Sequence, residues 1–384
     1  MHDEVFDIAI IGLGPAGANF ARLVSPNFRV IAFDKKPADP AAQGFHKPCG
    51  GLLNPNSQEA FARLGLQLPK SVLSDPMIFS VKTIDLGQNL KRNYLRNYIN
   101  TDRHEFDLWL KSLIPSHVQV MHNTLVTAIE FDKQRACYKI TATIDGTART
   151  FMARTVVGAD GAVSPTRHAI CPGYKPIAYV AKQQWFSAEG IDKSYACFLD
   201  SRLTDSYGWL ATKHDKVILG IALPQQNCKE AFDIFVQRVK GYGYPLGEPL
   251  KTEACLVLKP GNFCHGNGQG AFLLGEAAGF ITPNLEGISS ALYSSTALAA
   301  AFNRHTTLTP KDCKAILASY KSGTRRIRLR ILLKRLKSPF IYHPFLRRLV
   351  MKSAIAALPE YRLSFPSQLC NSFTNQGVRQ SFIC

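Results

Sequence analysis

The sequence is 384 residues long, which is enough for two joined domains. Its composition, 46% hydrophobic and 19% charged, is typical of globular proteins, and no apolar run approaches the roughly 18 residues that a membrane span needs. The formal net charge of +18 indicates a polyanionic neighbour or a strongly solvated face.

The cysteines and the first residues narrow the class further. The ten cysteines include no C-x-x-C pair and no His/Cys cluster at zinc spacing, which predicts no metal site, no disulfide framework and mostly inert thiols, with Cys49 as an exception. Asp3 and Glu4 stand where a signal peptide would need basic and then apolar residues. We therefore expect a cytoplasmic protein with no spanning helix.

The first predicted elements surround a glycine-rich turn. A short apolar strand, Asp7–Ile11, leads into GLGPAG at 12–17, and small apolar residues at helical spacing follow. In such a turn Gly12 permits the sharp bend, Gly14 lets the backbone approach a pyrophosphate, and Gly17 allows close packing of helix on strand. The free N–H groups at the helix start would face the phosphates.

A second apolar strand, Arg29–Phe33, ends in Asp34, about 20 residues beyond the glycines. A carboxylate at that position hydrogen-bonds the ribose of a bound dinucleotide. The alternative is an ordinary β-α-β unit in which Asp34 merely ends a strand. Because the strand, the glycines and the acid agree, the sequence favours a dinucleotide-binding unit.

The segment from residue 35 to 51 is rich in proline, glycine and alanine and predicts a loop that closes with the compact turn KPCGG at 47–51. A helix is expected over Asn56–Leu66, with Ser57 as its cap. Patches of alternating apolar and polar residues over Val72–Arg92 then indicate strands, as expected where the chain leaves the first domain for another.

A further helix is expected over Asn100–Leu113, with Arg103 at its start. Strands follow at 118–120, 124–131, 136–143, 149–153 and 155–158, with a hairpin turn at Asp145-Gly146. The last of these strands runs into Ala159-Asp160-Gly161. A helical turn carrying Arg167, a structural or surface-facing cation, comes next.

Residues 174–259 read mostly as strands with one helix at 229–240, which predicts a second domain with an antiparallel sheet. Its aromatic residues Trp185, Tyr207 and Trp209 are candidates for a substrate pocket and equally for the core of the sheet.

The chain is expected to return to the first domain after residue 265. The GNGQG run at 266–270 looks like a second dinucleotide motif, but a strand at 271–275 follows it instead of a helix, so we expect no NAD(P)H site there. The rest of this return to the first domain consists of Gly275-Glu276, a loop at 281–286 and the helix Gly287–Phe302.

The C-terminal region is strongly basic. No Asp or Glu occurs between Cys313 and Pro359, where twelve Lys and Arg residues lie. An apolar stripe flanked by basic side chains comprises Leu329, Leu332, Leu333 and Leu336. We expect residues 325–352 to contact an anionic membrane, with packing on the chain's own domain as the next alternative. Nucleic acid ranks third because regular aromatic interleaving is missing.

Four motifs occur in order: GLGPAG with Asp34, KPCGG at 47–51, VGADGAVSPTR at 157–167 and LLGEAAGFITPNLEGI at 273–288. Together they resemble the FAD-dependent geranylgeranyl-reductase family, which is similar in architecture to para-hydroxybenzoate hydroxylase. The segments GFHKPCGGLL, IFSVKT, RNYIN and EFDLWLKSLIP are most similar to the CbrA group of that family. The resemblance ends near Pro359.

This resemblance implies an α/β fold with an α+β second domain. A discontinuous Rossmann-like FAD-binding domain (1–75, 100–172 and 265–310) would be joined to an antiparallel-sheet substrate domain (76–99 and 173–264) and to basic C-terminal helices (311–384). The residues to which it gives FAD-binding roles are Gly12, Gly14, Pro15, Ala16, Gly17, Asp34, Lys47, Cys49, Gly50, Gly51, Arg103, Asp160, Gly161, Gly275, Glu276, Gly287 and Ile288.

Two positions depart from that family's pattern. The family usually has Asp where this chain has Glu276, and it usually has an extra glycine in the loop at 283–286. We expect FAD binding to persist in spite of both changes.

The resemblance also implies hydride transfer from reduced flavin to an alkene carbon of an isoprenoid or other lipid. Cys49 is a candidate proton donor or a small wall residue, and His46 is a second candidate acid or a surface histidine. NAD(P)H is expected only as a transient reductant. The alternatives are an FAD-dependent monooxygenase of the same fold and a membrane- or partner-binding flavoprotein with little turnover.

Overall fold

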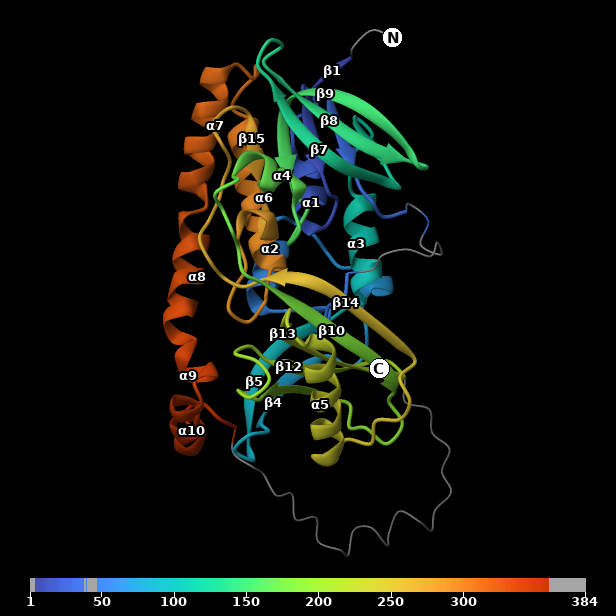
Figure 1. Cartoon of the computed structure of the whole chain (residues 1–384), viewed down its shortest axis with the longest axis vertical. Coiled ribbons are helices and arrows are strands. Elements are labelled where there is room, and N and C mark those ends of the chain that lie inside the picture. Colours follow the sequence, from blue (N-terminus) through green and yellow to red (C-terminus); the bar gives the residue numbers. More distant parts are fainter. Residues whose placement is uncertain (1–3, 38, 40–46, 359–384) are drawn as a thin grey trace, which may run out of the picture.

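The computed structural model describes residues 4–37, 39 and 47–358. Within these residues the strands form a sheet of seven and a sheet of eight strands, which follow one another along the long axis of the molecule (Figure 1). The C-terminal helices run down one flank past both sheets. This arrangement confirms the predicted α/β class with a second, sheet-based part and C-terminal helices.

The upper sheet in Figure 1 has the order β6-β2-β1-β9-β8-β7, and β15 also pairs with β9. Its strands are β1 (Val5–Ile11), β2 (Val30–Phe33), β6 (Val118–Met121), β7 (Thr124–Asp132), β8 (Cys137–Ile144), β9 (Thr147–Gly158) and β15 (Ala271–Leu273). The pairs of β1, β2, β6, β9 and β15 are parallel, which fits the buried apolar runs of β1, β2, β15 and the end of β9. The predicted hairpin turn is confirmed, because Asp145 and Gly146 both have positive φ (48° and 78°).

Helices α1 (Pro15–Leu23) and α6 (Ile288–Phe302) pack together beside this sheet. Both are rich in small residues, so their backbones approach closely, and the buried Asn19 amide donates to Ser295 Oγ (2.7 Å) between them. With β1 and β2, helix α1 forms the strand–turn–helix–strand unit predicted from the sequence.

The lower sheet has the order β14-β10-β13-β12-β11-β4-β5-β3. Its strands are β3 (Leu52–Leu53), β4 (Ile78–Asp85), β5 (Leu90–Asn100), β10 (Ala178–Ser187), β11 (Tyr195–Leu199), β12 (Gly208–Lys213), β13 (Lys216–Pro224) and β14 (Lys251–Leu258). It is antiparallel as predicted, except that β4 and β11 are parallel. Helix α5 (Cys228–Gly241) covers one face by burying Phe232 and Phe235.

The remaining elements differ from the sequence prediction in small ways. They are α2 (Pro55–Arg63), α3 (Arg103–Ser112), α4 (Pro165–Ile170) and the single turns η1 (Lys70–Val72) and η2 (Gly275–Ala278). The cap of α2 is Asn54, which accepts from the Ser57 backbone N–H (2.9 Å), so Ser57 lies inside the helix. Proline fixes φ for a first helical position, and Pro55 sets this earlier start.

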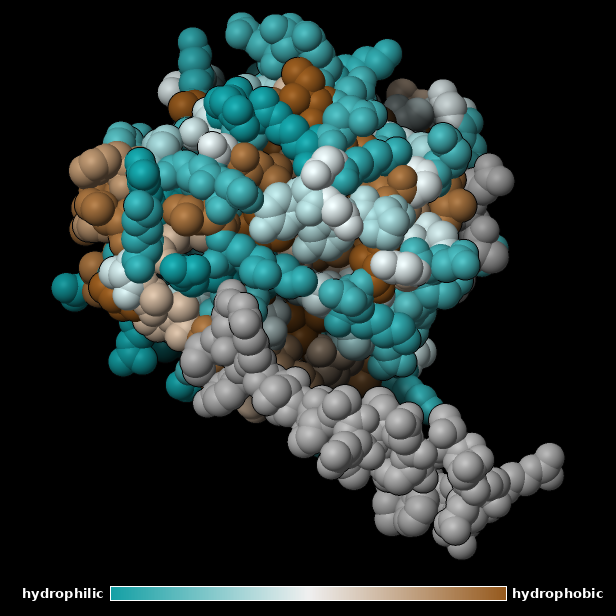
Figure 2. All heavy atoms as spheres, turned by 90° about the horizontal axis from the view of Figure 1, so that it is seen from below, coloured by the Kyte–Doolittle hydropathy of each residue, from teal (hydrophilic) through white to brown (hydrophobic). Residues whose placement is uncertain are grey.

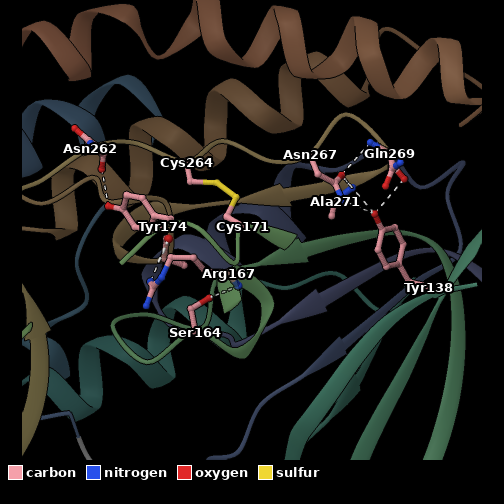
Figure 3. The surroundings of a disulfide bond; sticks show 11 residues. Tyr138, Ser164, Arg167, Cys171, Tyr174, Asn262, Cys264, Asn267, Gln269 and Ala271 are labelled. Atoms are coloured by element: carbon pink, nitrogen blue, oxygen red, sulfur yellow. Dashed lines mark hydrogen bonds between the residues drawn. A yellow bond between two sulfur atoms is a disulfide. The ribbon is translucent and has the colours of Figure 1, made fainter. Parts of the chain in front are cut away.

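One expectation about the cysteines was wrong. A disulfide joins Cys171, at the end of α4, to Cys264, in the loop before β15 (Figure 3). The two residues are 93 positions apart, so no local spacing marks the pair. Tyr174, close by, donates its hydroxyl to the Asn262 carbonyl (2.6 Å), which ties the same two segments.

The flank is built from α7 (Pro310–Gly323), α8 (Arg325–Lys337), the short α9 (Pro339–Tyr342) and α10 (Pro344–Ser353) (Figure 1). Helix α7 packs on α6 and begins with a capping box between Thr309 and Asp312. Among the described residues, none of the helices has the length and apolarity that a membrane crossing requires.

Candidate cofactor and substrate site

A cavity of about 510 Å³ is formed by residues of both sheets. One end is lined by the β1–α1 turn, the end of β2 and the start of α3, and other wall residues come from β12, β14 and the loop before α6. Ligands of open α/β sheets bind beyond the carboxyl ends of the parallel strands, which is where the glycine turn contributes to this cavity.

The β1–α1 turn places its glycines as the motif predicts. Gly12 (φ 91°) and Gly14 line the cavity together with Pro15 and Ala16, while Gly17 lies beneath them. A Cβ on Gly17 would stand 1.9 Å from the Gly12 carbonyl oxygen, whereas one on Gly14 would meet nothing within 4 Å. The backbone is therefore open on the cavity side, and no side chain in the described part of the chain caps the first N–H groups of α1. This turn fits a pyrophosphate.

Asp34 ends β2 and lines the cavity, as predicted for an acid that contacts a ribose. Its carboxylate forms an ion pair with Lys111 of α3 and accepts from the Lys36 backbone N–H (3.3 Å). No sequence pattern marks this Lys111 contact, because the two residues are brought together only by the packing of α3.

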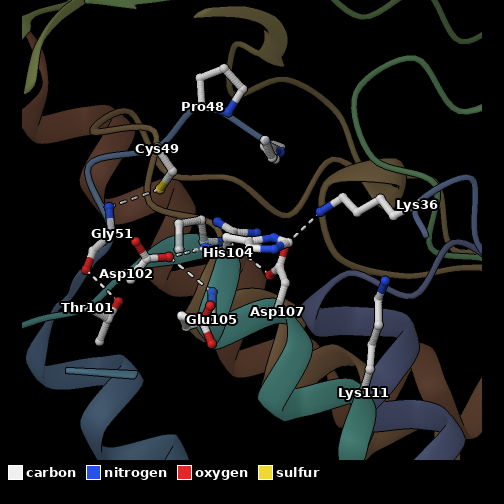
Figure 4. A network of polar contacts seen from close by, with 12 residues as sticks. Lys36, Pro48, Cys49, Gly51, Thr101, Asp102, His104, Glu105, Asp107 and Lys111 are labelled. Atoms are coloured by element: carbon white, nitrogen blue, oxygen red, sulfur yellow. Dashed lines mark hydrogen bonds and ion pairs between the residues drawn. The ribbon is translucent and has the colours of Figure 1, made fainter. Parts of the chain in front are cut away.

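The start of α3 carries a buried charge network (Figure 4). Arg103 Nε donates to Asp107 Oδ1 (3.0 Å), and Lys36 Nζ donates to Asp107 Oδ2 (2.8 Å). Burial opposes ionisation of Asp107, but the charges of Arg103 and Lys36 outweigh it and hold the pKa of this carboxyl well below its usual range. Two cations share one carboxylate here, which leaves net positive charge facing the cavity, suited to a diphosphate.

The turn at 47–51 brings Cys49 to the same wall. Gly51 (φ 61°) is required there, since a Cβ would lie 2.2 Å from the Thr101 carbonyl oxygen, and its N–H donates to Cys49 Sγ (3.4 Å). Burial favours the neutral thiol, but Arg103, this N–H and Lys47 together lower the pKa of Cys49. Cys49 is therefore more acidic than an ordinary thiol. His46 lies outside the described residues.

Lys47 and Glu276 join the two parts of the cavity wall through an ion pair (Lys47 Nζ to Oε2, 2.6 Å). Glu276 Oε1 also accepts from the Leu258 backbone N–H of β14 (2.8 Å). The predicted cofactor residue Glu276 lines the cavity, but its carboxylate already has partners in the protein. Gly275 (φ 53°) lies behind it and donates its N–H to Ser294 Oγ (3.1 Å).

Asp160 and Gly161 also line the cavity. The Asp160 carboxylate accepts from the Ser164 hydroxyl and from the Thr166 N–H (3.0 Å), so it holds the loop that opens α4. Arg167, which could have been surface-facing, is instead buried and donates to the carbonyls of Gly161, Ala162 and Ala277. It is a structural cation.

The start of α6 supplies two further wall residues, Gly287 and Ile288. Among the described residues no side chain caps this helix, so its first N–H groups are available to an anionic or carbonyl oxygen. The FAD-binding role that the family resemblance implies for these two residues stays a prediction.

Two of the three predicted aromatic residues reach the cavity. Tyr207 and Trp209 of the β12 region line it, and the indole Nε1–H of Trp209 has no hydrogen-bond partner among the described residues. The prediction for Trp185 is corrected, because it does not line the cavity and its indole donates to Glu253 Oε2 (2.8 Å). Trp185 shares a face of β10 with the lining residue Ala181 but stands about 13 Å further along the strand.

Sequence reasoning missed three residues of this region. Tyr98 and Tyr195 line the cavity from β5 and β11. Lys213, at the end of β12, is buried and donates to the Thr101 carbonyl (2.8 Å) and to Asn100 Oδ1, directly beneath the Gly51 turn. Burial lowers the pKa of Lys213 to about 7. No sequence motif marks a lysine of this kind.

Comparisons with known proteins identify the family. No family model matches the sequence. Protein CbrA of Escherichia coli O157:H7 is 42% identical over 365 residues, which cover 94% of this chain and 99% of that protein. The chain belongs to the CbrA family. Protein CbrA of Shigella sonnei is similar to it in the same way, at 41% identity.

Solved structures similar to this CbrA-family chain share its fold at low sequence identity. A geranylgeranyl bacteriochlorophyll reductase-like protein of Thermoplasma acidophilum has a TM-score of 0.71 at 16% identity, covering 87% of this chain and 86% of that one. PqsL of Pseudomonas aeruginosa, described as a probable FAD-dependent monooxygenase, has a TM-score of 0.63 at 17% identity, covering 92% and 100%.

The flavin-dependent halogenase CmlS has a TM-score of 0.65 at 18% identity, covering 98% of this chain and 71% of that protein. The predicted flavoprotein fold is thereby confirmed for this member of the CbrA family. Reductases, monooxygenases and halogenases all share that fold, so the likeness does not single out geranylgeranyl reductases.

Proposed function

We propose that this protein is an FAD-dependent oxidoreductase that reduces double bonds of an isoprenoid or other lipid-like substrate. The observation that carries the proposal is the make-up of one cavity. Its wall combines a glycine turn open to phosphate and the Arg103–Lys36 cations with the aromatic residues Tyr207 and Trp209.

In this proposal, groups of the chain itself bind FAD at the end of the cavity formed by the β1–α1 turn. The first N–H groups of α1 and the Arg103 guanidinium would hold the pyrophosphate, and Asp34 would accept from the ribose. Bound FAD supplies hydride chemistry at its N5 atom. The N–H groups at Gly287 and Ile288 would stabilise negative charge on the reduced ring.

Cys49 is the proton donor of the proposed reaction. Reducing an alkene by hydride leaves the neighbouring carbon to take up a proton, and a thiol with lowered pKa gives one up more readily near neutral pH than an ordinary thiol does. After that transfer, Arg103 and the Gly51 N–H would stabilise the thiolate. Lys213, beneath the same turn, is close enough to affect this charge but has no assigned step.

The substrate end is assigned to the aromatic wall. The cavity is lined there by Tyr98, Tyr195, Tyr207 and Trp209. Burial raises the pKa values of Tyr195 and Tyr207 well above the usual range, so both phenols stay neutral. An apolar chain would contact these neutral rings, and the unpartnered Trp209 N–H would orient a polar head.

A monooxygenase of the same fold is the second candidate, favoured by the likeness to PqsL. A membrane- or partner-binding flavoprotein with little turnover is a third. NAD(P)H would act as a transient reductant, since the GNGQG run at 266–270 leads into β15 and not into a helix. The protein would work in the cytoplasm.

The three candidates differ in how the reduced flavin is reoxidised. The purified protein should show flavin absorbance in the visible range, and anaerobic photoreduction should bleach it. A reductase is then reoxidised by an isoprenoid lipid without oxygen. Rapid oxygen consumption with a hydroxylated product would support the monooxygenase instead, and no reoxidation by any polyprenol, quinone or lipid extract would support the third candidate.

Replacing Cys49 tests the proton assignment. We expect Cys49→Ala to slow anaerobic reoxidation by about 100-fold, the usual contribution of a general acid, while flavin absorbance stays unchanged. Cys228→Ser removes a thiol on α5 that does not line the cavity and serves as the matched control. Equal rates for both variants would make Cys49 a wall residue.

A further inference from the structure

Helix α8 presents two opposite faces. Ile327 and Ile331 are buried against the rest of the chain (8% and 1% exposed). At about 100° per residue, the predicted leucine stripe lies on the other side of the helix. Its members are exposed by 43% to 73%; they are Leu329, Leu332, Leu333 and Leu336. The stripe therefore does not pack on the chain's own domain within the described residues.

Basic side chains flank this exposed stripe on both sides. By the same helical spacing, Arg328 and Arg335 lie along one edge, and Arg326, Arg330 and Lys337 lie along the other. Within the described part of the chain, one basic residue of α8 forms an ion pair: Lys334 Nζ lies 2.7 Å from Glu286 Oε2. The other cations of α8 have no carboxylate of the described residues at salt-bridge distance.

The apolar surface continues along α9 and α10. Phe340 and Ile341 are 52% and 41% exposed, and Phe345 and Leu349 are 63% and 52% exposed. Seen from the lower end, the molecule shows apolar side chains among hydrophilic ones at its left edge, the side on which α8 to α10 lie (Figure 2). We call the exposed residues of α8, α9 and α10 the flank surface.

The flank surface is held rigidly. Arg347 of α10 is buried, and its Nε donates to Asp85 Oδ2 of β4 (2.6 Å). The same guanidinium donates to the carbonyls of Ile341 and Tyr342 (3.1 and 3.0 Å), which fixes α9 against α10. Burying these exposed apolar side chains in a partner therefore requires no prior ordering of the helices.

Two contacts connect the flank surface to the cavity. Lys334 pairs with Glu286, and the Tyr342 hydroxyl contacts Asn284 Oδ1 (3.2 Å). Both Glu286 and Asn284 line the cavity, and the Tyr207 hydroxyl donates to the Asn284 carbonyl (2.9 Å). The loop at 283–286 is thus shared by the flank surface and the wall of the site.

We propose that the flank surface docks on an anionic lipid bilayer, with the leucine stripe entering the acyl boundary and the flanking Arg and Lys side chains among the headgroups. The exposed face of α8, an apolar stripe between basic side chains, has the pattern of a helix face that lies in the plane of the interface. Delivery of a lipid-like substrate to the adjoining cavity rests on the proposed function; docking itself does not.

Charge decides between this occupant and two others. A second copy of the chain would bring the same excess of cations against itself. Residues 359–384 contain one Glu and two Arg, so their side chains carry no net negative charge to match the surface. Anionic headgroups do match it, and each basic residue near an acidic leaflet adds to the attraction.

Flotation of the full-length protein with liposomes tests the proposal. We expect it to float with vesicles of phosphatidylcholine mixed with phosphatidylglycerol, not with phosphatidylcholine alone, and to be released by high salt. Flotation with neither vesicle, or equally with both, would overturn the proposal, as would a stable dimer in solution that does not float.

Two pairs of substitutions separate the apolar and the charged contributions. Leu332→Ser with Leu336→Ser should lower partitioning on the order of tenfold, and Arg326→Gln with Lys337→Gln on the order of 30-fold. The control is Ile177→Ser with Leu250→Ser, at similarly exposed positions elsewhere (64% and 62%). Equal partitioning of all three variants would contradict the proposal.

The two proposals fail separately. If isoprenoid dispersed in detergent reoxidises the reduced protein but the protein does not float, the docking proposal is wrong and the oxidoreductase stands. If the protein floats but no lipid reoxidises it, docking stands without the proposed reaction.

Discussion

The two ends of the cavity are built in different ways. The glycine turn, Asp34 and the start of α3 are each set by a few neighbouring residues, whereas the aromatic wall combines side chains from β5, β11 and β12. Local sequence patterns mark the separate elements of the first end, although packing adds the Lys36–Asp107 and Lys111–Asp34 contacts, whereas no local pattern marks the residues of the second end. Substitutions at the first end should therefore abolish binding of the cofactor. Substitutions at the second end should change the KM for the substrate by smaller amounts.

The largest effect is expected at the glycine turn. Gly17→Ala would place a Cβ 1.9 Å from the Gly12 carbonyl oxygen, so the turn must shift and the cavity side of the backbone with it. We expect the purified variant to lack flavin absorbance. Gly247→Ala meets nothing within 4 Å and should retain the flavin. A Gly17→Ala protein that is purified with a full complement of bound flavin would contradict the assignment of the pyrophosphate to this turn.

The next effect concerns Lys213, which is buried beneath the Gly51 turn. Its pKa is about 7 in the folded protein and 10.5 ordinarily, so the unfolded chain binds more protons between these values and stability rises with pH across that window. Wild-type protein should gain about 3 kcal/mol of unfolding free energy between pH 7 and pH 10 relative to Lys213→Met.

Urea denaturation at several pH values measures this difference. The exposed Lys216, three residues further along the chain, provides the matched control in Lys216→Met, which should keep the wild-type pH dependence. Parallel stability curves for wild type and Lys213→Met would show that Lys213 is not held in its neutral form.

The smallest effects are expected at the aromatic wall. Trp209→Phe removes an indole that lines the cavity and an N–H without a partner, and should raise the KM for the lipid about tenfold with little change in kcat. Trp185→Phe lies outside the lining and should leave the KM unchanged. If both substitutions had the same effect, the aromatic end would not be the substrate end.

The same contrast explains how much the sequence predicted. The β1–α1–β2 unit, the hairpin at Asp145-Gly146 and the helix that starts at Arg103 follow from local patterns, and the structure has them all. The family resemblance, and not a local pattern, gave Arg103 its role in the cavity that it lines. Trp185 was misplaced because strand alternation gives the face of a sheet but not the position along it.

Residues that act through tertiary packing could not be predicted. The Cys171–Cys264 disulfide, the Lys111 partner of Asp34 and the buried Lys213 each join segments far apart in the chain. For the basic C-terminal helix, the sequence predicted the leucine stripe, but only the structure shows that α8 buries the opposite face.

The central claim is that one cavity holds FAD and a lipid double bond together. Mass spectrometry of the lipid recovered after photoreduced protein is mixed anaerobically with a polyprenol tests it most directly. The account predicts a polyprenol that has gained a pair of hydrogen atoms while the flavin returns to its oxidised spectrum. An unchanged polyprenol beside a flavin that stays reduced would contradict it.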